Sequence, residues 1–221
     1  VPYIISNYAE IFNMRMRKKK NGSARMEACG EYVLTMNELS LAAKDKPLYV
    51  EIGCGKGTFL CESALRDGGA FFIGFERVFD VALLAAEKLR EREVPNARVT
   101  VGNAAGIADM FVPHSVKRIY LNFSDPWPKA RHAKRRLTYR SFLESYKKIL
   151  TPDGEIFFKT DNRPLFDFSL EELRESGFHL RNITNDLHSS EWEEGNIHTE
   201  YEDNFSAKGF KINRVEAYLQ P

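Results

Sequence analysis

The sequence predicts an α/β fold built around a mostly parallel β-sheet. From Leu48 onward, short apolar runs alternate with segments whose apolar residues recur at helical spacing. Breaks rich in glycine, proline or asparagine separate these segments, and no internal repeat or low-complexity linker interrupts the alternation. Because strand–helix–strand crossovers are right-handed and bring successive strands into parallel order, we expect helices on both faces of the sheet.

The first part of the regular region reads as strand, helix, strand, helix, strand. These elements are expected at 48–52, 59–65, 71–75, 78–89 and 98–101, in that order. A glycine-rich turn at 53–57 joins the first strand to the first helix, and the break Pro95-Asn96 precedes the third strand.

The second part continues the alternation and ends in two late strands. We expect a strand at 119–123, a helix at 139–150, a strand at 155–159, a helix at 165–175, a strand at 179–184, a short helix near 199–207 and a strand at 210–219. Pro152-Asp-Gly154 closes the first of these helices, and Gly177 ends the second. The two late strands are expected to form an antiparallel hairpin at the sheet edge.

Length and composition predict one domain. We expect an N-terminal extension and basic arm over residues 1–30, flexible over 14–25, and a single domain over 31–221. No apolar run reaches the roughly 18 residues of a membrane span, and no signal-peptide pattern is present, so a cytoplasmic protein without a membrane partner is expected. Three cysteines without a CxxC pair or a histidine cluster at zinc spacing predict reduced thiols and no metal.

The net charge of +1 conceals strong segregation. Residues 15–25 and 129–140 each contain six Lys or Arg and no acid, whereas residues 186–203 contain seven acids and no Lys or Arg. Two purely basic runs on a nearly neutral chain favour a local phosphate-binding surface, and the alternative for each is an ordinary solvated face.

The segment from Tyr120 to Arg136 is the most informative part of the chain. Asp125 follows a buried strand, and Pro126 and Pro128 then prevent strand pairing and helix continuation. Asp125 is therefore expected at the carboxyl end of a strand, where open α/β sheets bind their ligands. With Trp127 and the basic run beside it, this edge indicates chemistry on a nucleic-acid base; the alternative is an aspartate that merely caps a turn.

The glycine turn Gly53-Cys-Gly-Lys-Gly57 departs from both common phosphate-binding patterns. Thr58 stands where a dinucleotide-binding turn requires its third glycine, and the Walker A pattern also fails. What remains is a tight turn that a ligand without phosphates could approach, or a turn that binds nothing. Glu76, 23 residues after Gly53, is placed to accept hydrogen bonds from ribose hydroxyls. Glu51 near a cation, Glu76 on the ribose and Asn103 on the adenine would fit S-adenosylmethionine.

With these residues in place, the chain resembles the bacterial tRNA (guanine-N7)-methyltransferase family from Met14 to near the C-terminus. The matching motifs are Met14-Arg-Met-Arg-Lys-Lys19, Glu51-Ile-Gly-Cys-Gly-Lys-Gly57, Asn122-Phe-Ser-Asp-Pro-Trp-Pro-Lys129, Arg131-His-Ala-Lys-Arg-Arg-Leu137, Phe158-Lys-Thr-Asp161 and Thr199-Glu-Tyr-Glu202. The resemblance implies a Rossmann-like class I methyltransferase fold with a seven-stranded sheet and S-adenosylmethionine as the cofactor, with S-adenosylhomocysteine as its product. It further implies a variable-loop guanine of tRNA as the substrate. The oligomeric state is expected to be a monomer or a homodimer.

The resemblance also implies roles for individual residues. The cofactor is expected to contact Glu51, Gly53, Gly55, Glu76, Asn103 and Asp125, and Asp125 is also the expected catalytic residue. The substrate is expected to contact Lys129, Asp161, Thr199, Glu200, Tyr201 and Glu202, with the RNA backbone on Arg131, Lys134, Arg135 and Arg136. Relatives often carry Asp at the position of Asn103 and usually begin at the position of Met14, so we assign no function to Val1–Asn13.

The chemistry of guanine N7 fits these residue types. N7 has an in-plane lone pair and can attack a sulfonium methyl without losing a proton, so Asp125 is expected to stabilise the positive charge that forms on the base. A further carboxylate, from Asp161, Glu200 or Glu202, could accept the N1–H and N2 donors of guanine. Trp127 either stacks on the extruded base or plugs the turn. Two alternatives are a methyltransferase for exocyclic amines and a catalytically silent RNA-binding protein; the Trp between the prolines and the intact acidic residues weigh against them.

Overall fold

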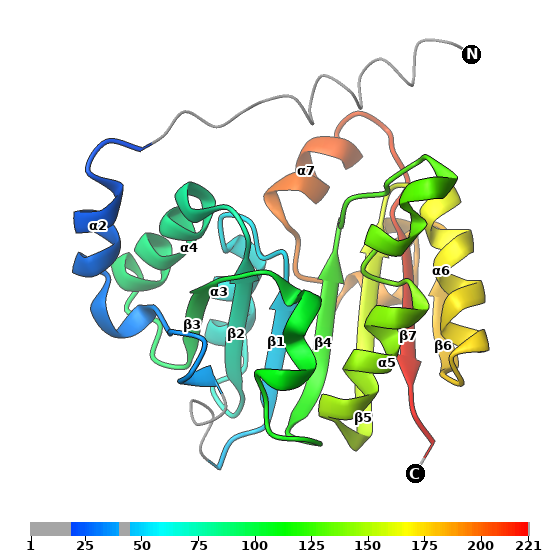
Figure 1. The fold of residues 1–221 in the computed structure, drawn as a ribbon. Helices are drawn as coiled ribbons and strands as arrows, with labels where there is room; N and C mark the ends of the chain where they lie inside the picture. The colour runs from blue at the N-terminus through cyan, green and yellow to red at the C-terminus, as the bar shows by residue number, and fades with distance from the viewer. Residues whose placement is uncertain (1–18, 40–44, 221) are drawn as a thin grey trace.

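The computed structural model describes residues 19–39 and 45–220, which form a seven-stranded sheet with helices on both faces (Figure 1). Val1–Asn13 and the first residues of the expected basic arm, 14–18, lie outside the described residues. The strands are β1 (Leu48–Ile52), β2 (Phe71–Glu76), β3 (Ala97–Val101), β4 (Val116–Asn122), β5 (Leu150–Thr160), β6 (His179–Thr184) and β7 (Asn213–Tyr218).

The sheet is mostly parallel and ends in an antiparallel pair. Its order is β3-β2-β1-β4-β5-β7-β6, and every pairing from β3 through β5 is parallel. Strand β7 runs antiparallel to both β5 and β6. The predicted fold class and the late antiparallel pair are therefore confirmed.

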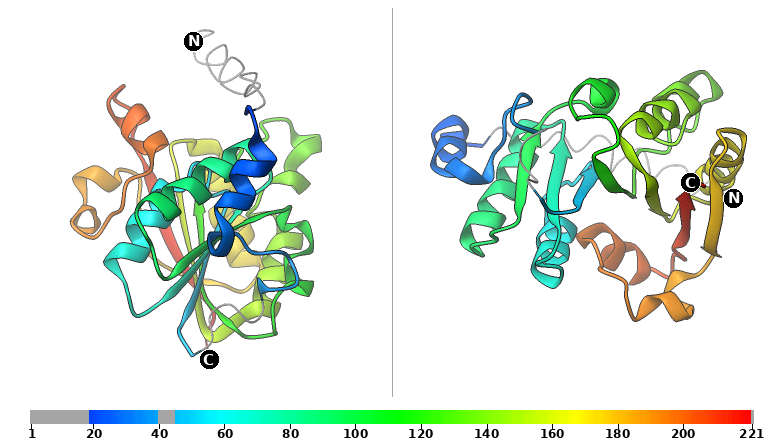
Figure 2. Two further views of the ribbon diagram at one scale, coloured as in Figure 1. Left: turned by 90° about the vertical axis from the view of Figure 1, so that its left-hand side faces the viewer. Right: turned by 90° about the horizontal axis from the view of Figure 1, so that it is seen from below.

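Helices cover the two faces unequally. α3 (Thr58–Arg66) and α4 (Phe79–Glu91) pack on one face, and α5 (Arg140–Ile149) and α6 (Arg163–Glu175) pack on the other (Figure 2). The α5/α6 face buries an unbroken aliphatic and aromatic core to which Ile119, Leu121 and Phe158 contribute side chains with no exposed surface.

The opposite face of β4, β5 and β7 carries charged and aromatic side chains. Because side chains alternate across a strand, Arg118, Tyr120, Phe157 and Arg214 face away from that core. Of the α3/α4 pair, only α3 reaches this half of the sheet, through Phe59; the segment with η5 (Leu187–Ser189), η6 (Glu191–Glu193) and α7 (Glu200–Ser206) lies over it (Figure 2).

Two local expectations were wrong. The arm expected to be flexible contains α2 (Gly22–Ala28), which packs on α4, and Arg25 donates to both carboxylate oxygens of Glu87 at 2.8 and 2.7 Å. The basic run, for which no element was expected, forms the 3-10 helix η4 (Ala130–Arg135). Strand β5 begins at Leu150, before the expected turn at 152–154, and its register with β4 shifts across that turn.

Among the described residues, no helix combines the length and the apolar character that crossing a bilayer requires. Cys29, Cys54 and Cys61 are all buried and free, as expected for reduced thiols.

Candidate active site

A cavity of about 600 Å³ lies at the carboxyl ends of β1, β2 and β4, the edge at which the sequence placed a ligand. Of the six residues expected to contact a cofactor, four line this cavity: Gly53, Glu76, Asn103 and Asp125. Lys134 and Arg135 from the basic run line it as well. The fold thus brings Gly53 and Arg135, which are 82 positions apart in the sequence, to the same cavity.

The glycine turn is held tightly against the end of β2. The backbone N–H groups of Gly53 and Cys54 both donate to the Phe75 carbonyl, at 2.8 and 2.9 Å. Gly53 and Gly57 adopt φ values of +83° and +75°, which favour glycine, and a Cβ added at Gly57 would lie 2.7 Å from the Ala85 side chain. The turn therefore requires glycine for geometric reasons before any ligand is considered.

Glu76 is positioned by this turn and by the start of α4. Its carboxylate accepts from the backbone N–H of Val78 at 2.8 Å and from that of Gly55 at 3.3 Å. Gly55 adopts φ +56° in the same turn, but Gly53, not Gly55, forms the cavity wall. Glu76 remains on the wall with its carboxylate fixed in direction, as a hydrogen-bond acceptor for a ligand requires.

Glu51 lies behind the cavity wall in a pair with Asn122. Asn122, which does line the cavity, donates its side-chain N–H to Glu51 Oε1 at 2.9 Å. Burial raises the pKa of Glu51 to about 7, against the opposing effects of the Asn122 hydrogen bond and the Lys159 charge. Glu51 Oε2 and Asn122 Oδ1 are both buried and have no hydrogen-bond partner. Two such acceptors side by side favour a cationic or donor ligand.

Asp125 belongs to a strained turn that the neighbouring basic segment supports. Phe123 and Trp127 adopt φ values of +52° and +40°, which bulky residues rarely take. The Arg136 guanidinium donates to the carbonyls of Pro126 and Trp127, at 3.0 and 3.1 Å. Burial raises the pKa of Asp125, and the charge of Arg77 opposes this effect.

The expectation that Arg136 meets the RNA backbone with its neighbours does not fit this geometry. Its guanidinium is half-buried, holds the turn and packs over the Phe168 ring at 4.3 Å. By contrast Lys129, Arg131, Lys134 and Arg135 are exposed. Arg135 also covers the Trp127 ring at 4.9 Å, so this indole is partly packed as well as facing the cavity.

The segment Thr199–Glu202 forms the start of α7 through a capping box. Thr199 Oγ1 accepts from the Glu202 N–H at 2.9 Å, and the Glu202 carboxylate accepts from the Thr199 N–H at 3.4 Å. Glu202 has no exposed surface and also accepts from the buried Lys159 ammonium at 2.7 Å. Glu202 therefore cannot reach a base without losing this pair, which leaves Asp161 and Glu200 as the candidate guanine readers.

Glu200 bridges α7 to the glycine turn and α4. It accepts from Lys56 at 2.9 Å, from Thr58 at 3.0 Å and from Lys88 at 3.2 Å. The hydrogen bond from Lys56, with those from Lys88 and Thr58, lowers the pKa of Glu200 to about 2 despite partial burial. Tyr201 next to it stacks on Phe205 at 4.1 Å and lies 5.1 Å from Phe123, while Asp161 directly follows β5 at the same sheet edge.

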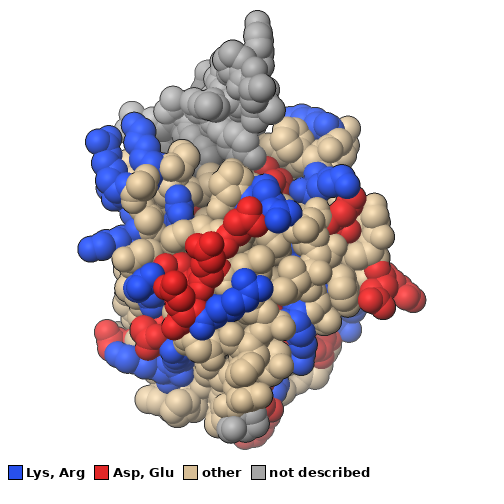
Figure 3. All heavy atoms as spheres, turned by 90° about the vertical axis from the view of Figure 1, so that its right-hand side faces the viewer, with Lys and Arg blue, Asp and Glu red and all other residues tan. Residues whose placement is uncertain are grey.

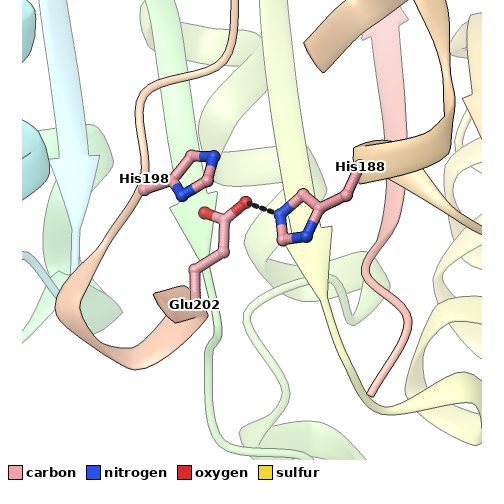
Figure 4. Close-up of side chains that lie close together, drawn as sticks. All are labelled: His188, His198 and Glu202. Atoms are coloured by element: carbon pink, nitrogen blue, oxygen red, sulfur yellow. Dashed lines mark hydrogen bonds and ion pairs between the residues drawn. The ribbon is translucent and has the colours of Figure 1, made fainter. Parts of the chain in front are cut away.

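Two histidines that the sequence did not single out hold the segment Thr199–Glu202 in place. His188 Nε2 lies 3.0 Å from Glu202 Oε1, and the nearly parallel rings of His188 and His198 are 5.0 Å apart (Figure 4). These three residues have the composition of a metal site. Yet Lys159 and Asn196 already donate to Glu202, and His198 is hydrogen-bonded to Glu193 and Asp203 at 2.7 Å each. The side chains satisfy one another, so we assign the cluster a structural role.

Comparisons with known proteins place the chain among methyltransferases. A family model described as "Putative methyltransferase" matches residues 45–215. The chain is 44% identical over 214 residues to the tRNA (guanine-N(7)-)-methyltransferase of Geobacillus sp. (strain WCH70), covering 94% of this chain and 97% of that protein. It is 51% identical over 176 residues to the protein of the same name from Lachnoclostridium phytofermentans, covering 80% of this chain and 82% of that protein.

Solved structures with much lower sequence identity share the fold. An antibiotic-related methyltransferase matches with a TM-score of 0.58 at 15% identity, covering 91% of this chain and 95% of that one. A 30S ribosomal A1408 methyltransferase from an uncultured bacterium matches with a TM-score of 0.54 at 12% identity, covering 93% and 97%. A Haemonchus contortus phosphoethanolamine N-methyltransferase 2, in complex with S-adenosyl-L-methionine, matches with a TM-score of 0.53 at 10% identity, covering 91% and 52%.

Proposed function

Because this chain belongs to the family of tRNA (guanine-N(7)-)-methyltransferases, we infer that it transfers a methyl group from S-adenosylmethionine to N7 of a guanine in tRNA. The observation that carries the assignment to this site is the meeting of Glu76, Asp125 and the basic side chains of Lys134 and Arg135 on one cavity. A ribose acceptor, a carboxylate for a developing cation and phosphate-binding groups are the components that this reaction needs.

The described residues fit S-adenosylmethionine. Glu76, with its carboxylate fixed by Val78, is the proposed ribose acceptor, and Asn103 on the same cavity wall is the proposed contact of the adenine. We assign the positively charged end of the cofactor to Asn122 on the cavity wall, with Glu51 hydrogen-bonded directly behind it. When bound, S-adenosylmethionine supplies an electrophilic methyl group on a sulfonium.

Asp125 acts on the charge that forms during transfer. The N7 lone pair forms the new N–CH3 bond while the S–CH3 bond breaks and its electrons return to sulfur, which leaves S-adenosylhomocysteine. No proton leaves N7, so no general base is needed, and a positive charge appears on the imidazole ring of guanine. The half-buried Asp125 carboxylate, at the cavity wall, stabilises that charge in surroundings less polar than water.

The base and the RNA are held by groups at the same sheet edge. Asp161 and Glu200 are the candidate acceptors for the N1–H and N2 donors of guanine, and the low pKa of Glu200 keeps it ionised. The exposed residues Lys129, Arg131, Lys134 and Arg135 form the phosphate-binding surface. The face at the β6 edge instead mixes acidic with basic side chains, which disfavours it as an RNA surface (Figure 3). The variable loop of tRNA is the proposed target, and the cytoplasm is the proposed location.

Nucleoside analysis of the product tests this function. The purified chain, S-adenosylmethionine carrying a labelled methyl group and unmodified tRNA should yield labelled 7-methylguanosine after complete digestion of the RNA. Label found only in a base methylated on an exocyclic amine would refute the assignment.

A further inference from the structure

A second cavity, of about 570 Å³, lies on the α3 side of the sheet, against β1, β4, β5 and β7. Its outer wall is the segment from Glu191 to Ile197, which leads directly into Thr199 and the start of α7. Asn122 lines both cavities, so they meet on either side of the carboxyl end of β4. We call this second space the aromatic–arginine cavity.

Aromatic rings form much of its wall. Tyr49, Tyr120 and Phe157 come from three adjacent strands, Phe59 from α3 and Trp192 from the outer segment. The strand and helix rings meet edge to face, with centroids 4.9 Å apart for Phe59 and Tyr120 and 5.6 Å apart for Tyr120 and Phe157. Such a wall suits a planar, polarizable ring.

The charges around this cavity do not balance. Three guanidinium groups share two carboxylates: Arg118 and Arg181 pair with Glu155, and Arg181 and Arg214 pair with Glu216. Lys159, a further cation in the wall, is already matched by Glu202. Arg214 also keeps an unmet donor, because its Nη1 is buried and has no hydrogen-bond partner.

The remaining charges face solvent. Arg66, Asp67, Glu191 and Glu194 line the opening of the cavity and are exposed, so water and salt screen them. Arg118 lies inside, 4.2 Å from the Phe157 ring and 4.9 Å from the Tyr49 ring. The interior therefore presents aromatic rings together with the guanidinium side chains of Arg118 and Arg214, which is the recognition chemistry of a planar ring joined to an anion.

We propose that the aromatic–arginine cavity binds one nucleotide, with its base among the aromatic rings and its phosphate on Arg214. A cavity of this size falls in the range that holds a small molecule of nucleotide size. The proposal rests on the proposed function, which brings RNA to the neighbouring segment Thr199–Glu202. The nucleotide is either an unstacked residue of the tRNA or a free mononucleotide.

Calorimetry with GMP tests the free nucleotide on the full chain in excess S-adenosylhomocysteine. Arg214→Met and Trp192→Ala each remove one side chain from the cavity wall. Trp192 lies on the outer segment, so the loss of its side chain leaves the sheet intact. Arg181→Met is the matched control, because Arg181 pairs with the same Glu216 but does not line the cavity. GMP should bind with one site, at least about tenfold more weakly to both cavity variants and unchanged within about twofold to the control.

The KM for tRNA, measured on the wild type and the same three variants, tests whether the bound nucleotide is a residue of the tRNA. An RNA nucleotide in the cavity raises KM about tenfold in Arg214→Met and Trp192→Ala but not in Arg181→Met, even where free GMP binds too weakly to detect. If both cavity variants keep wild-type affinity for GMP and wild-type KM for tRNA, the proposal is wrong. Formation of 7-methylguanosine by the wild-type protein is scored separately, so the failure of the cavity and the failure of the proposed function are distinguishable.

Discussion

Replacement of Glu51 by Gln tests the electrostatics at the base of the cofactor cavity. Burial raises the pKa of Glu51 to about 7 from an ordinary value of 4.5. A shift of roughly 2.5 units corresponds to about 3 kcal/mol of preference for the protonated carboxyl in the folded protein. Without a cationic partner, an ionised Glu51 therefore costs the fold about that much.

The sign of the effect on stability follows from the two pKa values. The unfolded chain loses this proton near pH 4.5 and the folded chain near pH 7, so the contribution is fully present below about pH 4.5 and is lost as the pH rises to about 7. Glu51→Gln has no proton to lose. Urea unfolding without cofactor should give equal stability near pH 4 and up to about 3 kcal/mol more stability for the variant at pH 8.

The same titration controls the affinity for the cofactor. With a pKa of about 7, roughly one-tenth of Glu51 is ionised at pH 6 and nine-tenths at pH 8. Wild-type affinity for S-adenosylmethionine should therefore rise about tenfold between these pH values, with proton release visible by calorimetry in buffers of different ionisation enthalpy. Glu51→Gln should bind weakly at both. The exposed carboxylate of Glu62 gives the control Glu62→Gln, and an unaltered pH dependence in Glu51→Gln would refute this reasoning.

Four other substitutions test separate parts of the site. Asp125→Asn should lower the single-turnover rate about 100-fold while tRNA affinity stays within about twofold, because only charge stabilisation is lost; a rate near that of the wild type contradicts this role. Lys134→Ala should reduce by about one the slope of log affinity for tRNA against log salt. Arg136→Met should lower the thermal midpoint and leave that slope unchanged, since Arg136 holds the turn; a lower slope would return Arg136 to the RNA surface. Lys159→Met leaves Glu202 buried without its partner and should cost about 3–5 kcal/mol in urea unfolding, part of which Glu202→Gln should restore; equal losses in the single and double variants would contradict the pairing.

The strands and helices were predictable where periodicity and breaks agreed. β1 and β2 lie where the apolar runs placed them, because both are buried central strands. β5 was misplaced at its start because its residues before Glu155 pair with β4 in a shifted register, and a proline and a glycine there look like a turn. α2 was missed because its anchor is Glu87, which is 62 residues away from Arg25.

The site was predictable for a topological reason. Parallel strands end at one edge, so Gly53, Glu76 and Asp125, each at or just after the end of a different strand, had to lie near one another. The roles of Arg136 and Glu202 could not be read this way, since they depend on partners that only the folded chain brings together. The second cavity did leave a signal: Arg118, Tyr120 and Asn122 stand at alternate positions of the strand, which marks a face that is not packed into an apolar core.

Position-specific strand scission tests most directly whether this cavity methylates guanine at N7. An unmodified tRNA transcript is incubated with the chain and S-adenosylmethionine, then reduced with borohydride and treated with aniline, which cleaves the RNA at 7-methylguanosine. We predict scission at a single guanine of the variable loop, lost when that guanine is replaced by adenine and nearly lost with Asp125→Asn. Methyl incorporation without scission would contradict the central claim.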